Sequence, residues 1–440
     1  MSFELTLQVL KTFFNYGVKN IMHFWLLIEG EPLVTDNDES RLHRMGALAE
    51  ALHAKGHQVS IWSSTTNHRD KTVRANNQLV TNYLPGYDVV LIDTPTYDRN
   101  ISLSRIRHNV KTAKKFNEIA CSSHIEFPDL ILCAYPAIEL SRAGVQFAKK
   151  ISVPVVVDIR DLWPDIFVEI LPHWIQAIAR VAVYPFNRQA CYIADNATAV
   201  VGITDEFVNW FEGKATNGTL KAKKTFHLSY KIEKLNDSER IEAHRFWLDK
   251  GLVSNKEVFT ICMFGNLSEN AEIPLLINAA SKILSDNLHK VRFVVCGVGE
   301  ILDQLLDASK DLPNFYLPGW VTKAQIRVLM EMSHAGVLPY RSDRGFELSL
   351  PNKVGEYLSE GLPILSSING VLSGFLDAEG VGFTYKNQNV DELIDAIYAL
   401  IEGKKLHKKM RKRAYSVFHR KFNAKTVYNN YAKYLESLAG

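Results

Sequence analysis

Several common functional signatures are missing from this 440-residue chain, and each absence narrows the possible functions. No Walker motif occurs and no Gly-x-Gly-x-x-Gly follows the first expected strand, which disfavours ATP-binding enzymes and NAD-dependent dehydrogenases. No Asp-x-Asp motif lies in a suitable strand context, so neither a metal nor another cofactor is expected. The formal net charge is only +3, which argues against an electrostatic nucleic-acid binder.

Cysteines and long apolar runs are also scarce. The five cysteines are odd in number and lack metal-ligand spacing, so we expect buried, reduced thiols in a cytoplasmic protein. No stretch approaches the roughly 18 consecutive apolar residues of a membrane-spanning helix. Residues 1–20 have no basic segment followed by a continuous apolar core and are not expected to be a signal peptide. They form either an amphipathic extension or a segment that precedes a start at Met22.

The hydrophobic patterning predicts two globular domains. The chain is 47% hydrophobic and 22% charged, and it is too long for one typical core. Buried-strand patterns alternate with helical patterns, and the series restarts after residue 220. This alternation predicts two doubly wound, Rossmann-like α/β domains facing across a cleft. We expect a first domain at 1–215, a second at 216–420 and a last helix in 421–440. The expected strands are 21–28, 57–62, 87–92, 130–134, 153–158 and 197–201, then 259–264, 291–296, 315–317, 335–338 and 364–366.

The segment that follows residue 348 carries the strongest functional signal. Pro351 near its start and Gly361 near its end are typical of helix boundaries. The free backbone N–H groups at the start of such a helix suit a phosphate, and Glu356 on its second turn would accept two ribose hydroxyls. An ordinary core helix with one exposed Glu explains the segment equally well. The ligand-binding candidates here are Ser349, Leu350, Asn352, Lys353 and Glu356.

Turns suited to a nucleotide follow four expected strands of the second domain. Glycine in such turns allows the backbone to approach a phosphate closely, and a base can lie against an exposed strand end. Each turn alone is weak support, because tight turns between strands and helices commonly contain glycine, but four together are more specific. The candidates at these strand ends are Gly265 and Asn266, Gly297 and Gly299, Trp320 and Val321, and Arg341.

Charged residues also follow a strand of the first domain. Asp158, Arg160 and Asp161 come at the end of the 153–158 strand beside a Trp-Pro turn, which favours a site. The alternative is a buried ion pair of Arg160 with Asp161 or Asp158 that shapes the loop. His68 falls just past another strand, where a lone histidine is usually a surface residue.

Together these segments resemble a family-4 retaining glycosyltransferase of the GT-B fold, over residues 21–440. The resemblance implies that the second domain holds a nucleotide sugar and the first an acceptor. Glu356 matches the second of the family's paired Glu residues, which holds the donor ribose. The first Glu of that pair would fall on Leu348, with Glu347 one place away.

For the reaction that the resemblance implies, we assign catalytic roles to residues of this chain as hypotheses. Lys353 and Arg341 would neutralise the diphosphate, since the family's usual Arg and Lys do not follow Asn266. Asp161 and His68 would orient or deprotonate the acceptor hydroxyl. The family's histidine at a strand end is replaced here by the segment from Cys133 to Pro136.

The most similar branch builds bacterial surface polysaccharide such as O-antigen or capsule, and shares Glu31-Pro32-Leu33, the 64–71 stretch and the turn from Asp158 to Pro164. It implies transfer of N-acetyl-L-fucosamine or a related amino sugar from a UDP donor to a lipid-diphosphate-linked saccharide. Two rivals remain open: a non-hydrolysing UDP-sugar 2-epimerase, and a catalytically inactive GT-B binding or scaffold protein.

A lipid-linked acceptor implies peripheral contact with the inner face of the cytoplasmic membrane. The apolar and aromatic segment 172–186 suits an interfacial helix, or else an ordinary buried helix. The basic run 404–413 would attract anionic lipid, or else forms a solvated surface helix. A last helix at about 424–438 is expected to pack on the first domain. Its apolar stripe consists of Val427, Tyr428, Tyr431, Tyr434 and Leu435.

Overall fold

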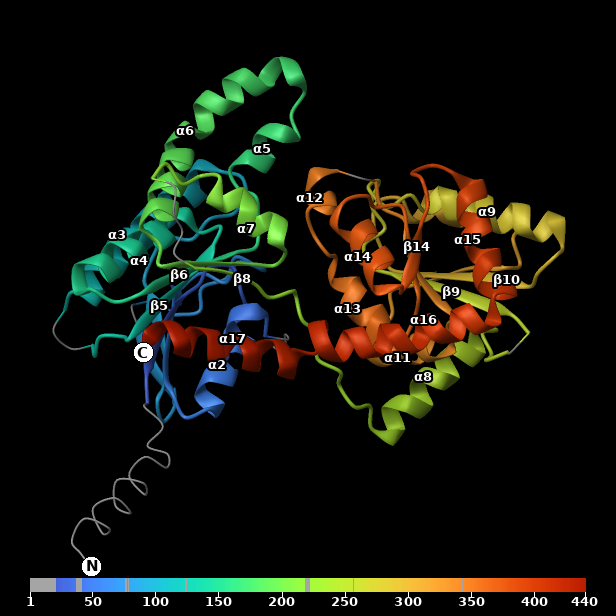
Figure 1. Cartoon of the computed structure of the whole chain (residues 1–440), viewed down its shortest axis with the longest axis horizontal. Coiled ribbons are helices and arrows are strands. Elements are labelled where there is room, and N and C mark those ends of the chain that lie inside the picture. The colour runs from blue at the N-terminus through green and yellow to red at the C-terminus, as the bar shows by residue number, and fades with distance from the viewer. Residues whose placement is uncertain are drawn as a thin grey trace, which may run out of the picture.

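The structure, a computed structural model, describes residues 21–440 apart from 37–41, 76, 78, 123–124, 218–221, 256 and 342. The expected extension at 1–20 lies outside the described residues. Two lobes stand side by side, and each is built on one sheet covered by helices (Figure 1). The prediction of two doubly wound α/β domains is confirmed.

The first lobe contains an eight-stranded sheet in the order β3-β4-β2-β1-β5-β6-β7-β8. All neighbours are parallel except β3, which runs antiparallel to β4. The central strands are continuous apolar runs because helices cover both faces of the sheet. The strands are β1 (His23–Leu27), β2 (Gln58–Ser64), β3 (Leu79–Leu84), β4 (Tyr87–Ile92), β5 (Leu130–Tyr135), β6 (Val155–Ile159), β7 (Ala199–Gly202) and β8 (Ala222–Thr225). The helices are α2 (Arg44–Ala54), α3 (Leu103–Ala120), α4 (Ile138–Ile151), α5 (Asp165–Glu169), α6 (His173–Asn196) and α7 (Asp205–Glu212).

The edge strands β3 and β8 were not expected from the sequence. Neither is a continuous apolar run, because an edge strand is covered less completely than a central one. Since β8 pairs with β7 along its whole length, the first sheet continues to Thr225. The expected boundary between 215 and 216 is therefore wrong, because it falls before the last strand of the first sheet.

The second lobe contains a six-stranded parallel sheet in the order β11-β10-β9-β12-β13-β14. Its five predicted strands are found, whereas β14 was not expected because its sequence, Gly-Phe-Thr, is not an apolar run. The strands are β9 (Phe259–Phe264), β10 (Val291–Cys296), β11 (Phe315–Gly319), β12 (Ala335–Leu338), β13 (Ile364–Ser366) and β14 (Gly382–Thr384). The helices are α8 (Asp237–Asp249), α9 (Ile273–Asp286), α10 (Leu302–Ser309), α11 (Lys323–Met332), α12 (Arg344–Glu347), α13 (Asn352–Ser359), α14 (Val371–Glu379), α15 (Val390–Glu402), α16 (Lys404–Val417) and a π-helical turn (Phe418–Phe422).

The strand order of each sheet reverses at one point, between β1 and β5 in the first lobe and between β9 and β12 in the second. Right-handed crossovers on the two sides of such a point place their helices on opposite faces of the sheet. A crevice then opens beyond the carboxyl ends of the strands, and ligands of doubly wound proteins bind there. The ends of these four strands are therefore where a site is expected.

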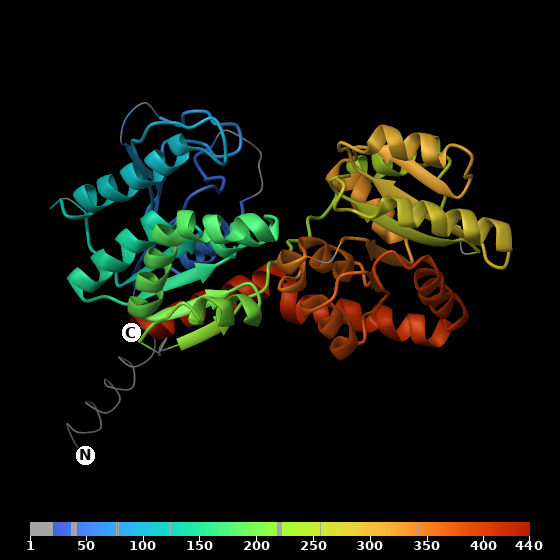
Figure 2. The ribbon, with the colours of Figure 1, turned by 90° about the horizontal axis from the view of Figure 1, so that it is seen from above.

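The last helix, α17 (Ala424–Ala439), returns to the first lobe as predicted (Figures 1 and 2). Its buried face joins the core that α2 forms with the first sheet. Tyr431 stacks on Phe226 with ring centres 4.4 Å apart, and the Arg44 guanidinium lies 5.2 Å from the centre of the Tyr431 ring. The end of the chain is thus part of the first-lobe core.

Three cysteines lie in these cores, namely Cys133, Cys262 and Cys296, while Cys121 is exposed. Burial raises the pKa of the Cys262 thiol to about 12, which keeps it protonated at neutral pH. Within the described ranges, no helix is both long and apolar enough to cross a bilayer.

Candidate active site

The ammonium of Lys353 lies against the loop that follows β9. Lys353 is in the first turn of α13, and it reaches Gly265, whose φ of +145° is easily adopted only by glycine. A Cβ at position 265 would lie 2.6 Å from Lys353 Nζ. The same nitrogen lies 5.4 Å from the centre of the Tyr340 ring, which follows β12. A cation therefore stands where the strand order of the second sheet reverses.

The neighbouring glycine loops pack directly on the Gly265 loop. The Gly265 N–H donates to the Cys296 carbonyl at 3.0 Å, and the Gly297 N–H donates to the Gly319 carbonyl at 2.8 Å. A Cβ on Gly297 would overlap the Gly265 carbonyl, and one on Gly299 would overlap the carbonyl of Leu267. Close packing between loops is thus a sufficient reason for glycine at 297 and 299, whatever they bind.

The start of α13 offers donors beside the same cation. Pro351 precedes the helix, as predicted. The leading N–H groups of an α-helix have no partner within the helix, so they add partial positive charge near Lys353. Glu356 is half-buried one turn further along. Leu350 packs its side chain into the second-lobe core, so only its backbone is available to a ligand.

The other predicted ligand-binding residues differ in exposure. Trp320 is 68% exposed at the end of β11, whereas the adjacent Val321 is buried. Asn266 and Asn352 are exposed. The Ser349 hydroxyl donates to a carbonyl of its own loop at 3.5 Å.

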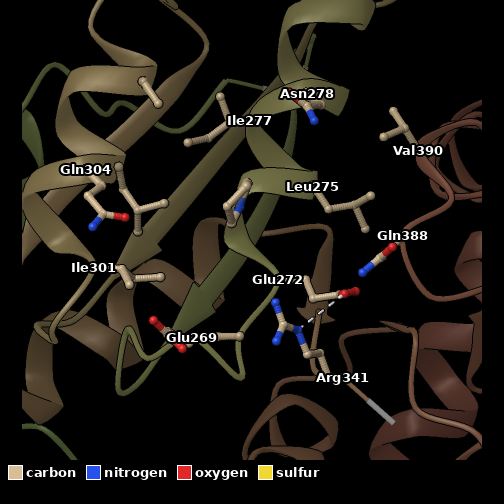
Figure 3. A pocket seen from close by; sticks show the side chains of 14 residues that line it. Glu269, Glu272, Leu275, Ile277, Asn278, Ile301, Gln304, Arg341, Gln388 and Val390 are labelled. Carbon is tan, nitrogen blue, oxygen red and sulfur yellow. Dashed lines mark ion pairs between the residues drawn. The ribbon is translucent and has the colours of Figure 1, made fainter.

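Arg341 faces a different neighbour from Lys353. Its Nε lies 3.9 Å from Glu272 Oε1. Arg341 also borders a cavity that none of the other predicted donor-site residues lines (Figure 3). The two cations that the sequence paired as partners for one diphosphate thus have different neighbours, Gly265 for Lys353 and Glu272 for Arg341.

Two buried ion pairs shape the first-lobe loops around β6. The Arg44 Nε donates to Asp158 Oδ2 at 2.6 Å, and Arg160 pairs with Glu31. Burial lowers the pKa of Arg44, but the Asp158 carboxylate outweighs that effect and raises it, so this pair stays ionised. The alternative of a structural ion pair is thus correct in kind but wrong in its partners. The pairing of Arg160 with Asp158 or Asp161 is not found, because Asp158 in β6 pairs with Arg44 and Arg160 reaches Glu31 in the loop after β1.

Asp161 remains exposed at the end of this strand. Its Oδ1 accepts from the Trp163 N–H at 3.0 Å, which fixes the turn. Although the residue is exposed, nearby protein reduces the hydration of its carboxylate and raises its pKa, with the two backbone N–H groups of the turn opposing the shift. A raised pKa makes this carboxylate a better proton acceptor than an ordinary Asp.

His68 belongs to a polar cluster beyond β1, β2 and β4. Its Nδ1 forms a hydrogen bond with the Tyr97 hydroxyl, and the Tyr97 ring packs edge-on against His108. Glu29 accepts from both the backbone and the hydroxyl of Ser64 at 3.1 Å. Burial, followed by the nearby Lys71, lowers the pKa of His68 to about 4, so its imidazole is neutral at pH 7.

Glu29, Tyr97 and His108 were not predicted from the sequence as members of this cluster. Glu29 follows the first strand almost directly, so the strand-end rule that selected other residues would have found it. Tyr97 and His108 lie in a loop and a helix whose spacing carries no signal, and only the tertiary fold brings them to His68. Among the residues that the structure describes, no group of three or more His, Cys, Asp or Glu is placed to hold a metal ion.

Known proteins resemble this chain in two ways: solved structures share its overall fold, and a family model matches the sequence of its second lobe. A sucrose-phosphate synthase from Thermosynechococcus elongatus superposes with a TM-score of 0.65 at 13% identity, covering 95% of this chain and 99% of that one. The Anabaena protein HepE, solved with UDP and glucose, gives 0.60 at 16%, with 95% and 100% covered. WaaG, a glycosyltransferase involved in lipopolysaccharide biosynthesis, gives 0.59 at 11%, with 94% and 99% covered. No curated protein sequence matches the chain. Residues 247–417 match the family model for group 1 glycosyl transferases. The chain therefore has the GT-B fold, and its second lobe carries a glycosyl transferase group 1 domain.

An interlobe contact occupies the position expected for the first Glu. Leu348 packs against the first-lobe core, and its carbonyl accepts from Thr204 Oγ1 at 2.7 Å. Arg344 of the same loop pairs with Glu169 of the first lobe. The loop between β12 and α13 therefore joins the lobes, which explains an apolar side chain at 348.

Proposed function

We propose that this glycosyltransferase moves a sugar, with retention of configuration, from a UDP donor to a saccharide linked by diphosphate to a lipid. The donor sugar is an N-acetylated amino or deoxyamino sugar such as N-acetyl-L-fucosamine, and the product belongs to a bacterial surface polysaccharide. The observation that carries the proposal is the Lys353 ammonium beside Gly265, at the point where the strand order reverses. Departure of UDP leaves negative charge on its diphosphate, and fixed positive charge at that position stabilises it.

The donor's nucleoside is assigned to the loops beside this cation. Glu356 accepts the two ribose hydroxyls, the first turn of α13 donates to the diphosphate, and the uracil lies against the backbone at Trp320 and Val321. Supporting this assignment, the structurally similar HepE is solved with UDP and with UDP-glucose. The charge on the diphosphate is neutralised by Lys353 in this proposal, since Arg341 faces Glu272.

The acceptor hydroxyl approaches from the first lobe. Asp161 is the group proposed to orient it and receive its proton, because this carboxylate is exposed and its pKa is raised. Neutral His68 is proposed to position the acceptor through the cluster that contains Tyr97.

In this proposal, α6 contacts the membrane that carries the lipid-linked acceptor. With α5, this helix extends beyond the rest of the first lobe (Figure 1). Trp174, Ile178 and Val181 are 78%, 70% and 75% exposed on one stripe of it, while Ala179 and Val183 pack on α5. An exposed apolar and aromatic stripe of this kind suits the interface of a bilayer. We propose peripheral binding to the inner face of the cytoplasmic membrane.

The test is a transfer assay with UDP-, GDP- and CMP-sugars and a lipid-diphosphate-linked acceptor. We expect transfer from a UDP-sugar only. Glu356→Ala should weaken UDP binding about tenfold or more, because hydrogen bonds to a charged group contribute about 1.5–3 kcal/mol each. Lys353→Met should lower kcat about 100-fold or more, the usual cost of one donor to developing charge. Unchanged UDP binding and turnover in both variants would contradict the donor site.

The competing 2-epimerase activity is separated by leaving out the acceptor. An epimerase converts its UDP-sugar without an acceptor, whereas a transferase leaves the donor sugar unchanged or slowly hydrolyses it. NMR spectra of the donor after incubation distinguish the two outcomes.

A further inference from the structure

A cavity of about 690 Å³ is lined by residues of the second lobe (Figure 3). It is bordered by the start of α9, by α10 and by the turn before α15. Its polar lining comprises Glu269, Glu272, Asn278, Gln304, Arg341 and Gln388. Its apolar wall consists of aliphatic side chains from the same elements, including Leu275, Ile301 and Val390. The volume falls in the range of small-molecule sites in proteins, roughly 300–1,000 Å³.

Glu272 lines this cavity and has a carboxylate oxygen without a hydrogen-bond partner. Its side chain is only 6% exposed, and its Oε2 is buried without a hydrogen-bond partner. The backbone N–H of Glu272 donates to the Pro339 carbonyl at 2.5 Å, which holds the residue in place. Figure 3 shows the carboxylate directed toward Gln388 across the cavity. A buried acceptor of this kind costs free energy unless a donor reaches it, so a ligand with a hydroxyl or amino group would stabilise it.

The charges around the cavity disfavour an anionic ligand. The charged lining residues are two carboxylates, Glu269 and Glu272, and one guanidinium, Arg341. Arg341 already faces Glu272, so no uncompensated cation remains among the lining residues for a phosphate or carboxylate. The side-chain amides in the lining both donate and accept hydrogen bonds, and they lie beside an aliphatic wall. This lining matches a sugar ring instead, because such a ring carries alternating hydroxyls and a face of C–H groups. We propose that this cavity binds a saccharide unit that carries no acidic group.

This site is distinct from the proposed donor site. Lys353, Glu356 and the loops at Gly265 and Gly297 line none of it. The crossovers that contain α9 and α10 lie on one side of the point where the strand order reverses, and the crossover that contains α13 lies on the other. Right-handed crossovers on the two sides of that point pack on opposite faces of the sheet, so the cavity and α13 lie on different faces of the sheet. The bound saccharide is therefore not the donor, and the site gives the enzyme a second hold on a glycan. The inference stands whether or not the donor is a UDP-sugar.

Saturation-transfer NMR with methyl glycosides tests the proposal. The probes are methyl glycosides of glucose, galactose, N-acetylglucosamine and glucosamine, with glucose 6-phosphate as the anionic comparison. Ala308→Trp fills the cavity from an exposed position on α10, and Ser281→Trp adds the same side chain on the exposed face of α9 outside it. Glu272→Gln keeps the shape and removes the charge.

We expect at least one methyl glycoside to bind the wild type and Ser281→Trp equally. Its affinity should fall about tenfold or more in Ala308→Trp and several-fold in Glu272→Gln, because the amide offers the ligand one acceptor fewer than a carboxylate. Binding of UDP should be unchanged in all three variants. The proposal is overturned if no methyl glycoside binds at millimolar concentration, if Ala308→Trp binds as well as the wild type, or if glucose 6-phosphate binds best. Should Ala308→Trp not fold, an unchanged affinity in Glu272→Gln overturns it.

Discussion

The ammonium of Lys353 occupies the space that any side chain on Gly265 would need. A Cβ at 265 would lie 2.6 Å from Nζ and 2.8 Å from Cε of Lys353, and the φ of Gly265 is +145°. Both facts make glycine necessary there, the first because it lets a cation approach the backbone and the second because other residues are strained at that angle. The absence of a side chain at position 265 thus leaves the room that the Lys353 ammonium occupies.

Gly265→Ala should therefore damage the donor site through Lys353. The strained backbone costs about 1–3 kcal/mol, and the displaced ammonium should lower kcat/KM for the donor by about tenfold or more. Steady-state kinetics and thermal unfolding measure the two effects. Gly374→Ala is the control, because nothing lies within 4 Å of its added Cβ in α14. This control should keep full activity and lose no stability. Equal kinetics in both variants would show that Lys353 is not positioned as described.

Much of this arrangement was predictable from the sequence, because it follows from local patterns. The strands β9, β10, β12 and β13 are apolar runs with sharp ends, and Pro351 and Gly361 mark the limits of α13. Placement of Gly265 and Lys353 at one point then follows from the topology of doubly wound sheets. The second lobe was accordingly predicted almost strand by strand.

The misses share a physical cause, which is contact between residues far apart in sequence. Arg44 and Asp158 are paired through tertiary packing, and so are Arg160 and Glu31. Leu348 replaces an expected Glu because it packs on the other lobe, a contact that no local pattern encodes. Edge strands such as β8 have too little apolar character to be seen without the neighbour that pairs with them.

The lowered pKa of His68 predicts a dependence of stability on pH. Because its folded pKa of about 4 lies below the unfolded value near 6.5, the folded protein binds fewer protons between these values. Its contribution to stability is therefore complete above pH 6.5 and is lost as pH falls toward 4. We expect a loss on the order of 1 kcal/mol at pH 5 from this residue.

Thermal unfolding of the wild type and His68→Gln at pH 7.5 and pH 5 measures this contribution. The difference in Tm between the two pH values should be smaller in the variant. Some difference should remain, since burial also lowers the pKa of His334 to about 4. An identical difference in both proteins would mean that His68 titrates normally.

The apolar stripe of α6 predicts binding to anionic vesicles. Trp174→Ser with Ile178→Ser removes two large exposed side chains whose replacement leaves the core intact. Each buries apolar surface in a bilayer interface, at roughly 25 cal/mol per Å², so the double variant should bind vesicles about tenfold or more weakly. Vesicle co-sedimentation gives the affinity. Leu288→Ser, on an equally exposed apolar residue of the second lobe, is the control and should bind like the wild type.

The buried pair of Arg44 and Asp158 predicts that the first lobe depends on α17. Arg44 bonds Asp158 and the Phe226 carbonyl, and its guanidinium lies over the Tyr431 ring of α17. Arg44→Met would leave a buried carboxylate without its partner, and breaking a buried pair in this way costs about 3–5 kcal/mol. Chemical denaturation measures the loss in the free energy of unfolding. Lys223→Met, which breaks the exposed pair with Glu212, should cost less than about 1 kcal/mol.

A second substitution separates the charge from the packing. Asp158→Leu in the Arg44→Met background removes the orphaned carboxylate, so the double variant should recover most of the lost stability if desolvation of that charge is the cause. If the double variant is as unstable as Arg44→Met, the guanidinium acts mainly by packing on Tyr431. In that case Tyr431→Leu should be as destabilising as Arg44→Met, because either change removes the same contact between α2 and the last helix.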